Sequence, residues 1–257
     1  MPPLSDSVVA TLRSAGCVFA EDEAELILST ARTPDEVTAM VDRRVSGLPL
    51  EHVLGWAGFH GLRIAVEPGV FVPRRRTEFL VDQAVALAQG ASLVVDLCCG
   101  SGAVGAALAA SLGSPELHAA DIDPAAVRCA RRNVVPFGGH VHEGDLFAAL
   151  PDTLRGRVDV LTANVPYVPT DEVGLLPSEA RDHEPLVALD GGADGLDILR
   201  RVTAEAPGWL APGGCLLVET SEAQAPMAVE TFADSGLIAR LEVSDELYAH
   251  VVIGTRP

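Results

Sequence analysis

Short apolar runs alternate with helical patterns over most of the chain, and this alternation restricts the fold more than any other feature. The runs at Ser92–Leu97, Glu116–Asp121 and Val158–Ala163 have the length of buried strands. An alternation of strands and helices predicts a mostly parallel sheet with helices on both faces, an α/β fold. The helix candidates between the strands are Val104–Leu112, Pro124–Asn133 and Leu196–Ala206.

The last part of the chain departs from this pattern. Cys215–Glu219 is another apolar run, and it follows a Pro-Gly-Gly turn at 212–214. Two further strand patterns, Leu237–Val243 and Ala249–Gly254, are joined by a link that is too short for a helix. This spacing predicts an antiparallel hairpin at the end of the sheet.

The N-terminal part of the chain carries three helical patterns. The third is the clearest, because Thr33 is an N-cap residue, Pro34 takes the first helical position and Glu36 completes a capping box. Three such short helices bury little apolar surface by themselves, so we expect them to depend on the rest of the chain. The other two helices are expected over Ser5–Ser14, with Ser5 as the cap, and over Glu21–Ala31.

Glycines separate the apolar and aromatic residues of the segment that follows, which is typical of a β-hairpin. The change of pattern on either side of this segment predicts three domains. They are a helical N-terminal domain over 1–48, a β-hairpin connector over 49–76 and an α/β domain over 77–257.

The composition limits the classes of function. Hydrophobic residues make up 48% of the 257 residues, which is enough for a sizeable core. The formal net charge is −18, and all 18 basic residues are arginines. An acidic surface repels phosphate backbones, so binding to nucleic acid is disfavoured.

The cysteines and the apolar segments bear on the cellular compartment. Five cysteines, at positions 17, 98, 99, 129 and 215, include no C-x-x-C pair. Neither a disulfide framework nor a metal site is predicted from them. The N-terminus has no signal-peptide pattern, and no segment offers about 18 consecutive apolar residues. We therefore expect a cytoplasmic protein without a membrane partner.

A glycine loop follows the first predicted strand, with the sequence DLCCGSG over 96–102. Gly100 and Gly102 permit tight turns and the close approach of a ligand at the start of the next helix. Asp96 ends the strand and is a hydrogen-bond acceptor for a cationic or amino group. The loop lacks the Gly-Lys-Ser/Thr of a P-loop, but GSGAVG over 100–105 leaves a dinucleotide as an alternative ligand.

Three further acidic residues lie near the ends of the next strands. Asp121 ends the second strand, where Rossmann-like folds place an acid that binds ribose hydroxyls. Asp123 precedes a proline and is expected to cap the next helix. Asp145 is a candidate acceptor for an adenine amine, with Leu146 against the ring, and the alternative is a solvated loop acid.

The fourth predicted strand runs into Asn164-Val165-Pro166-Tyr167. This sequence resembles the Asn-Pro-Pro-Tyr motif of amino-methyltransferases that use S-adenosylmethionine. From about residue 49 onward, the chain resembles the HemK/PrmC family of protein-(glutamine-N5) methyltransferases. The blocks that carry the resemblance are PGVFVPRRRTE (68–78), DLCCGSG (96–102), ADIDP (120–124), GDLF (144–147), NVPYVP (164–169), HEPLVALDGGADGL (183–196), LAPGG (210–214) and VVIG (251–254).

The resemblance implies a seven-stranded, Rossmann-like class I methyltransferase sheet whose last strand is antiparallel, with S-adenosyl-L-methionine as cofactor. It also implies that Asn164 and the Val165 carbonyl hold an amide nitrogen, while Tyr167 stacks over the amide plane. The implied catalytic residues are Asn164, Pro166 and Tyr167, and the implied substrate-binding residues are Asn164, Val165, Pro166 and Tyr167. The implied cofactor-binding residues are Asp96, Cys98, Cys99, Gly100, Ser101, Gly102, Asp121, Asp145, Leu146 and Asn164.

Two residues depart from the family pattern. Cys98 stands where the first glycine of the cofactor loop is expected, and Val165 stands where the substrate motif has its first proline. A main-chain carbonyl survives the exchange to valine, and the following Pro166 keeps Val165 extended. Methyl transfer therefore remains the prediction, and the identity of the acceptor stays open.

Several acceptors are compatible with this motif. The resemblance favours a glutamine side chain of a protein, and a translation release factor is the first candidate. The alternatives are a small-molecule amide or amine and a nucleic-acid base. A further alternative is a catalytically silent protein that binds the cofactor and acts as a partner of another protein.

Two polar clusters carry no role in this interpretation. The arginines at 74–76 form the only basic cluster, which would meet an acidic substrate or RNA, or, as is more common for such a run, be solvated or pair with acids of this protein. His183 and Glu184 invite an acid–base interpretation, but no nucleophile motif accompanies them, so a structural loop is favoured. Cys98 and Cys99 are expected to pack as small residues beside the loop.

Overall fold

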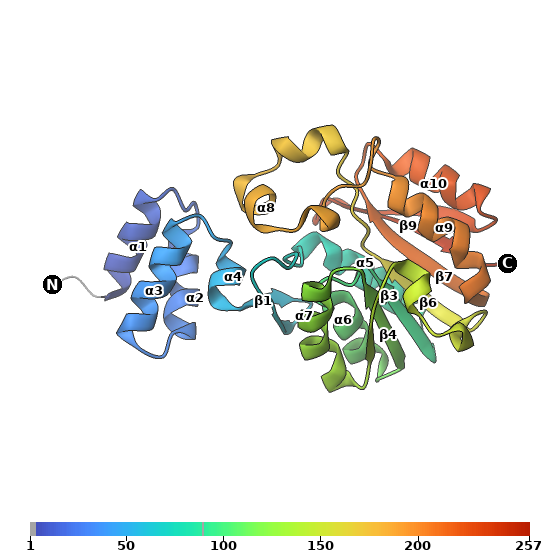
Figure 1. The fold of residues 1–257 in the computed structure, drawn as a ribbon, viewed down its shortest axis with the longest axis horizontal. Coiled ribbons are helices and arrows are strands. Elements are labelled where there is room, and N and C mark those ends of the chain that lie inside the picture. Colours follow the sequence, from blue (N-terminus) through green and yellow to red (C-terminus); the bar gives the residue numbers. More distant parts are fainter. Residues whose placement is uncertain (1–3, 89) are drawn as a thin grey trace.

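The computed structural model describes residues 4–88 and 90–257. Its centre is a seven-stranded sheet with the strand order β5-β4-β3-β6-β7-β9-β8 (Figure 1). The first five strands in this order are parallel, and β9 is antiparallel to both of its neighbours. The predicted α/β fold and its terminal hairpin are therefore confirmed. The strands are β3 (Leu93–Leu97), β4 (Glu116–Asp121), β5 (His140–Glu143), β6 (Val158–Ala163), β7 (Leu210–Thr220), β8 (Ile238–Ser244) and β9 (Ala249–Thr255).

Two layers of helices cover the sheet. Successive residues of β3 point to opposite faces, so Val94 lies in one apolar cluster and Val95 in the other. The cluster around Val94 takes its helical residues from α5, α6 and α7, and the cluster around Val95 takes them from α9 and α10. The covering helices are α5 (Glu78–Leu87), α6 (Ala103–Leu112), α7 (Pro124–Val134), α9 (Asp197–Trp209) and α10 (Ala225–Asp234). The short helix α8 (Ser178–His183) contributes no residue to either cluster.

The register of the central strands brings three chain segments to one edge of the sheet. Leu97, the last residue of β3, pairs with Ala120 of β4 and with Ala163 of β6. The carboxyl ends of these strands are therefore level. In open α/β sheets, ligands bind at this edge, where the strand order reverses.

Four short helices and a hairpin precede the sheet: α1 (Leu4–Ser14), α2 (Ala20–Thr30), α3 (Pro34–Val45), α4 (Leu50–Leu54) and the strands β1 (Trp56–Phe59) and β2 (Leu62–Ala65). The helices share a separate apolar cluster, and α1–α3 lie together at one end of the molecule (Figure 1). The hairpin instead joins the core of the sheet, since Phe59 and Ile64 belong to the same cluster as Val94. The three-domain division of the chain remains a prediction.

The capping residues of the first helices are partly as expected. Thr33 accepts a hydrogen bond from the main-chain N–H of Glu36 at 3.2 Å, which confirms the N-cap of α3. The Glu36 carboxylate accepts from the main-chain N–H of Arg32 at 2.6 Å, so the box closes one residue earlier than the usual pattern. The expected cap at Ser5 is wrong, because Ser5 lies inside α1.

Several elements were not evident from the sequence. The strand β5 has only four residues, two of them histidines, and no continuous apolar run marks it. The strand β7 begins at Leu210, so the expected turn at 212–214 lies within it as an irregularity in its pairing with β6. Among the helices of the described residues, none has the length and apolarity needed to cross a membrane.

Candidate active site

A cavity of about 970 Å³ opens at the level carboxyl ends of β3, β4 and β6. Typical pockets for small ligands have ~300–1,000 Å³, so this one has room for a cofactor together with part of an acceptor. The predicted site residues, apart from Gly102, lie in its wall, although the chain separates them widely. Those lining residues are Asp96, Cys98, Cys99, Gly100, Ser101, Asp121, Asp145, Leu146, Asn164, Val165, Pro166 and Tyr167.

The glycine loop turns sharply between β3 and α6. Three of its residues have positive φ: Cys98 at 52°, Gly100 at 53° and Gly102 at 77°. Around the position of a Cβ on Gly100 there is no heavy atom within 4 Å among the described residues, so a ligand can approach the main chain there. The loop thus has the open backbone that the sequence predicted, with Cys98 in a conformation that favours glycine.

Gly102 has a different position from the rest of the loop. A Cβ at this residue would lie 2.7 Å from Cγ2 of Val134, which belongs to α7. Gly102 is also the residue at the N-terminus of α6. It therefore allows α6 and α7 to pack closely. Gly102 does not line the cavity, although the resemblance implied that it binds the cofactor.

Asp121 connects β4 to the glycine loop. Its two carboxylate oxygens accept hydrogen bonds from the main-chain N–H groups of Gly100 at 2.8 Å and Asp123 at 2.9 Å. Burial raises the pKa of Asp121, and the hydrogen bonds from these N–H groups lower it. Each oxygen keeps a further lone pair for a ligand hydroxyl. Asp123 caps α7 as expected, accepting from the N–H of Ala125 at 2.8 Å.

Asp96 is buried at the end of β3 and already has partners in the protein. Its carboxylate accepts from the main-chain N–H of Gly105 at 2.9 Å and from the Thr162 hydroxyl at 3.0 Å. Burial raises the pKa of Asp96 to about 7, although the hydrogen bonds from Thr162 and Gly105 oppose this shift. The residue therefore fixes α6 and β6 to β3 in addition to facing the cavity.

Asp145 and Leu146 also line the cavity. The Asp145 carboxylate forms an ion pair with Arg201 of α9 at 2.7 Å. Leu146 is buried with a φ of 47° and begins a 3₁₀ turn. The Asp145 side chain is paired with Arg201 but 48% exposed, so its role as the acceptor for an adenine amine stays a prediction beside that of a solvated loop acid.

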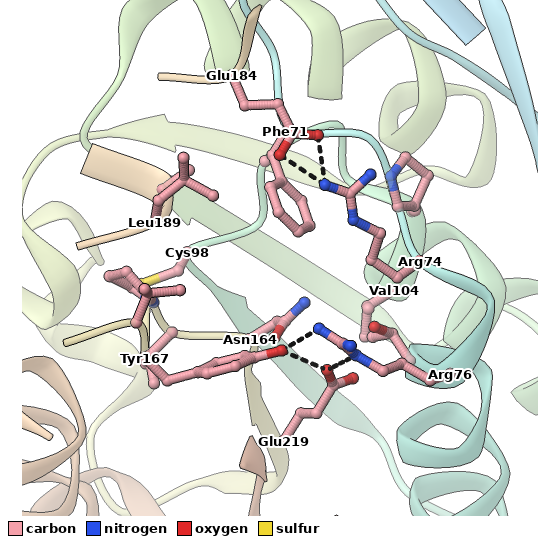
Figure 2. Close-up of a pocket in the computed structure, with 18 of the residues that line it drawn as sticks. Phe71, Arg74, Arg76, Cys98, Val104, Asn164, Tyr167, Glu184, Leu189 and Glu219 are labelled. Atoms are coloured by element: carbon pink, nitrogen blue, oxygen red, sulfur yellow. Dashed lines mark hydrogen bonds and ion pairs between the residues drawn. The ribbon is translucent and has the colours of Figure 1, made fainter. Parts of the chain in front are cut away.

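The residues that follow β6, from Asn164 to Val168, line the cavity as well. Figure 2 shows the Asn164 side chain pointing into the cavity beside Tyr167. The structure records no hydrogen bond of this side-chain amide with any of residues 4–88 and 90–257, whereas Val165 is 2% exposed and packed in the core. Asn164 thus presents an amide oxygen that is free for a ligand.

A neighbouring loop holds this motif in place. The main-chain N–H of Gly191 donates to the carbonyl of Val168 at 2.8 Å, and a Cβ on Gly191 would lie 2.7 Å from the carbonyl oxygen of Pro166. The Gln224 side chain donates to the carbonyl of Tyr167 at 2.9 Å. The close approach at Gly191 explains why a glycine-rich block follows the motif in sequence.

Four charged residues in the cavity wall were missed as site residues. Arg76 forms an ion pair with Glu219 at 2.9 Å, and Arg74 forms one with Glu184 at 2.6 Å. Arg76 also donates a hydrogen bond to the hydroxyl of Tyr167 (Figure 2). Among the interpretations of the basic cluster, pairing with the protein's own acids therefore holds for Arg74 and Arg76. The blocks PGVFVPRRRTE and HEPLVALDGGADGL contained three of these residues but gave no sign of their pairing.

The chain is similar to known methyltransferases in sequence and in fold. The model of the methyltransferase small domain matches residues 61–175. A release factor glutamine methyltransferase of Geobacter sulfurreducens is 37% identical over 228 residues, which cover 87% of this chain and 79% of that protein. A 4-amino-L-phenylalanine/4-methylamino-L-phenylalanine methyltransferase of Streptomyces pristinaespiralis is 34% identical, covering 88% and 78%. A crystal structure of a methyltransferase from Pyrococcus furiosus matches with a TM-score of 0.57 at 17% identity, over 76% of this chain and 89% of that one, which supports the fold alone.

The cavity also suits the cofactor of this family, S-adenosylmethionine, which carries a positive charge on sulfur. Its wall includes the carboxylates of Asp96 and Asp121, and burial raises the pKa of both because it disfavours their ionised forms. A cation bound nearby would stabilise the ionised form of each. The open main chain at Gly100 leaves space beside these acids. The chain belongs to the release factor glutamine methyltransferase family and is an S-adenosylmethionine-dependent methyltransferase.

Proposed function

We propose that this protein methylates the side-chain amide nitrogen of a glutamine in a protein, and that a translation release factor is its acceptor. The observation that carries the proposal is the Asn164 amide, which faces the cavity that the glycine loop also lines. An amide oxygen in this position can accept an N–H of a second, planar amide. The name of the Geobacter relative supports the choice of acceptor.

In this proposal, the residues after β6 orient a weak nucleophile. The nitrogen of an amide has a delocalised lone pair, so it needs acceptors for its protons and a fixed direction of attack. Asn164 Oδ1 and the Val165 carbonyl accept its two N–H groups, and the Tyr167 ring covers the amide plane. Bound S-adenosylmethionine supplies a methyl group on a positively charged sulfur. The nitrogen would gain this methyl as the S–CH3 bond breaks, the sulfur would keep the electron pair and leave as the neutral thioether S-adenosylhomocysteine, and one amide proton would pass to solvent. Positioning of this kind contributes up to ~7–11 kcal/mol.

The cofactor end is proposed to hold three parts of the ligand. Asp121 accepts from the ribose hydroxyls, Asp145 accepts from the adenine amine, and Leu146 packs against the adenine ring. Cys98–Gly102 surround the remainder through their main chain. The expected cytoplasmic location is part of the same proposal, and the free thiols of the described residues fit a reducing compartment.

The proposal is tested by incubating the protein with S-adenosylmethionine and a release factor. Mass spectrometry should find one added methyl group on a single glutamine. A release factor with that glutamine changed to asparagine is the matched control, because it keeps an amide but moves it by one methylene. Transfer to the control at the same rate, or no transfer to either protein, would contradict the proposal.

A second candidate acceptor is a small aromatic amine. The relative from Streptomyces pristinaespiralis is named for such substrates and aligns with most of this chain. Val165, which departs from the family motif, also lines the cavity next to Asn164, the proposed contact for the acceptor. The two candidates are separated by offering 4-amino-L-phenylalanine and release factor together with labelled cofactor. The acceptor with the higher kcat/KM is the substrate.

A further inference from the structure

The Tyr167 hydroxyl lies between two charged side chains. Arg76 donates a hydrogen bond to it from Nη2, and the hydroxyl donates to Glu219 Oε1 at 3.4 Å. Arg76 Nε closes the triangle by donating to the same Glu219 oxygen at 2.9 Å. Figure 2 shows the three side chains meeting at the cavity wall, with Asn164 beside them. We call Arg76, Tyr167 and Glu219 the tyrosine clamp.

The clamp joins three segments that are far apart in the chain. Arg76 lies in the 3₁₀ turn before α5, Tyr167 follows β6, and Glu219 is next to the last residue of β7. The separations are 91 residues between Arg76 and Tyr167 and 52 between Tyr167 and Glu219. No local propensity therefore produces this contact, which depends on the finished sheet.

Stability alone gives no reason for the clamp. The Glu219 side chain is 2% exposed, and its Oε2 is buried without a hydrogen-bond partner among the described residues. A buried carboxylate oxygen without a partner costs free energy, and well-packed apolar residues often stabilise a protein as well as a buried ion pair does. A charged pair kept at such a cost, in the wall of an active site, points to a role in function.

We propose that Arg76 and Glu219 are positioning residues that fix the orientation of the Tyr167 ring for the acceptor amide. The proposal rests on the proposed function, in which that ring covers the amide held by Asn164. A tyrosine ring pivots about its side-chain bonds, and contacts to its hydroxyl from two sides restrict this motion. Arg76 Cζ also lies 5.8 Å from the ring centroid, within the range of a cation–π contact. A displacement of about 1 Å at a reacting group costs up to about 10²-fold in rate, so small movements of the ring matter.

The first test is a double-mutant cycle on kcat with the acceptor identified above. Arg76→Lys keeps the positive charge near Glu219 but loses the planar fork, and we expect kcat to fall about 10-fold with little change in cofactor affinity. In a Tyr167→Phe background, which lacks the hydroxyl, the same change should cost less than about 2-fold. Equal losses in both backgrounds would overturn the proposal, because Arg76 would then act without Tyr167. Arg132→Lys changes an exposed ion pair with Glu67 outside the cavity wall and serves as the matched control.

The second test needs no turnover. The chain has two tyrosines, so Tyr248→Phe leaves Tyr167 as the sole source of tyrosinate absorbance. Burial and the neighbouring Glu219 raise the pKa of Tyr167 to about 12. In the Tyr248→Phe background, Glu219→Gln should lower the pH at which tyrosinate forms, since it removes the negative neighbour. If the pH of tyrosinate formation does not change, Glu219 does not contact the Tyr167 hydroxyl, and the proposal is overturned.

The two tests fail in different ways. If the wild-type protein methylates neither the release factor nor the aromatic amine, the proposed function is wrong, and the absorbance titration still decides whether the clamp exists. If the protein methylates an acceptor and the titration shifts, but kcat is additive in the cycle, only the positioning role is overturned.

Discussion

The two ends of the cavity are built in different ways. At the cofactor end, most of the hydrogen bonds to Asp96 and Asp121 come from main-chain N–H groups, such as that of Gly105 to Asp96, 9 residues apart, although the Thr162 hydroxyl also donates to Asp96. At the acceptor end, side chains meet across long separations, and Arg76 and Glu219 are 143 residues apart. The Asp96 and Asp121 carboxylates of the cofactor end are therefore held mainly by the main chain. The acceptor end depends on side-chain pairs, which a few substitutions can rearrange for another substrate.

The largest expected effect lies at the acceptor end. Asn164→Ala should lower the rate of methyl transfer by about 10²–10³, because an oriented hydrogen-bonding group is lost. Cofactor affinity, measured by calorimetry, should stay within about 3-fold, since the two ends are built separately. Asn164→Gln keeps the amide but displaces it by one methylene, so it should lose most of the activity too. If an Asn164 variant loses cofactor affinity and transfer rate by the same factor, the two ends of the cavity are not independent.

The next largest effect lies at the cofactor end. Asp121→Ala should weaken the binding of S-adenosylmethionine by about 10-fold or more, because the proposed acceptor for the ribose and the anchor of Gly100 both disappear. The matched control is Asp159→Ala, whose carboxylate also accepts main-chain N–H groups, from Ser92 at 2.7 Å and Leu93 at 3.0 Å. Asp159 lies outside the cavity wall, so its loss should lower stability and leave the calorimetric dissociation constant within about 2-fold. If the control weakens binding as much as Asp121→Ala, the effect reports loss of folding and not of a ligand contact.

A pH dependence should mark the buried acid of the cofactor end. Burial raises the pKa of Asp96 to about 7, whereas an unfolded aspartate has a pKa of about 3.9. Between these values the folded state binds a proton that the unfolded state does not, so the contribution of Asp96 to stability falls as the pH rises from about 4 to about 7. Urea unfolding of the wild type and of Asp96→Asn at about pH 5 and pH 8 should show this loss in the wild type and a smaller change in the variant. Equal changes in both proteins would assign the pH dependence to other groups.

The smallest expected effect concerns the strained residue of the glycine loop. Cys98 has a φ of 52°, which glycine adopts without the steric cost that a Cβ brings. Cys98→Gly should therefore be more stable than Cys98→Ala by about 1 kcal/mol in urea unfolding, since both variants lose the thiol and only glycine loses the strain. Equal stabilities would show that the loop relaxes around Cys98, and the cofactor end would be less rigid than its hydrogen bonds suggest.

The parts of the molecule that local patterns encode were predictable. The apolar runs located β3, β4 and β6 to within a residue, and the residues at or just past their ends, such as Asp121 and Asn164, could be placed at one edge of the sheet. Gly102 shows the limit, because a glycine in a loop serves a ligand or a neighbouring helix equally well in sequence. Its contact with Val134 appears only when α6 and α7 are packed.

The charged pairs of the acceptor end could not be predicted. Arg76 stands in a run of three arginines, and nothing in that run distinguishes the one that meets Tyr167 from its neighbours. Glu219 ends an apolar run and resembles any polar residue at a strand end. Pairing across such separations is set by the strand order, which a single sequence does not specify.

The carboxyl ends of β3, β4 and β6 are level, and this alignment sets the spacing of the residues that follow them. Cys98, Asp121 and Asn164 each come one residue after the same rung of the sheet, at Leu97, Ala120 and Ala163. One residue added to β6 ahead of this rung would shift the following chain by about 3.3 Å and turn its side chains to the other face. The main-chain hydrogen bonds between β3 and β6 therefore set the distance from the glycine loop to Asn164, and with it the separation of the proposed methyl donor and acceptor.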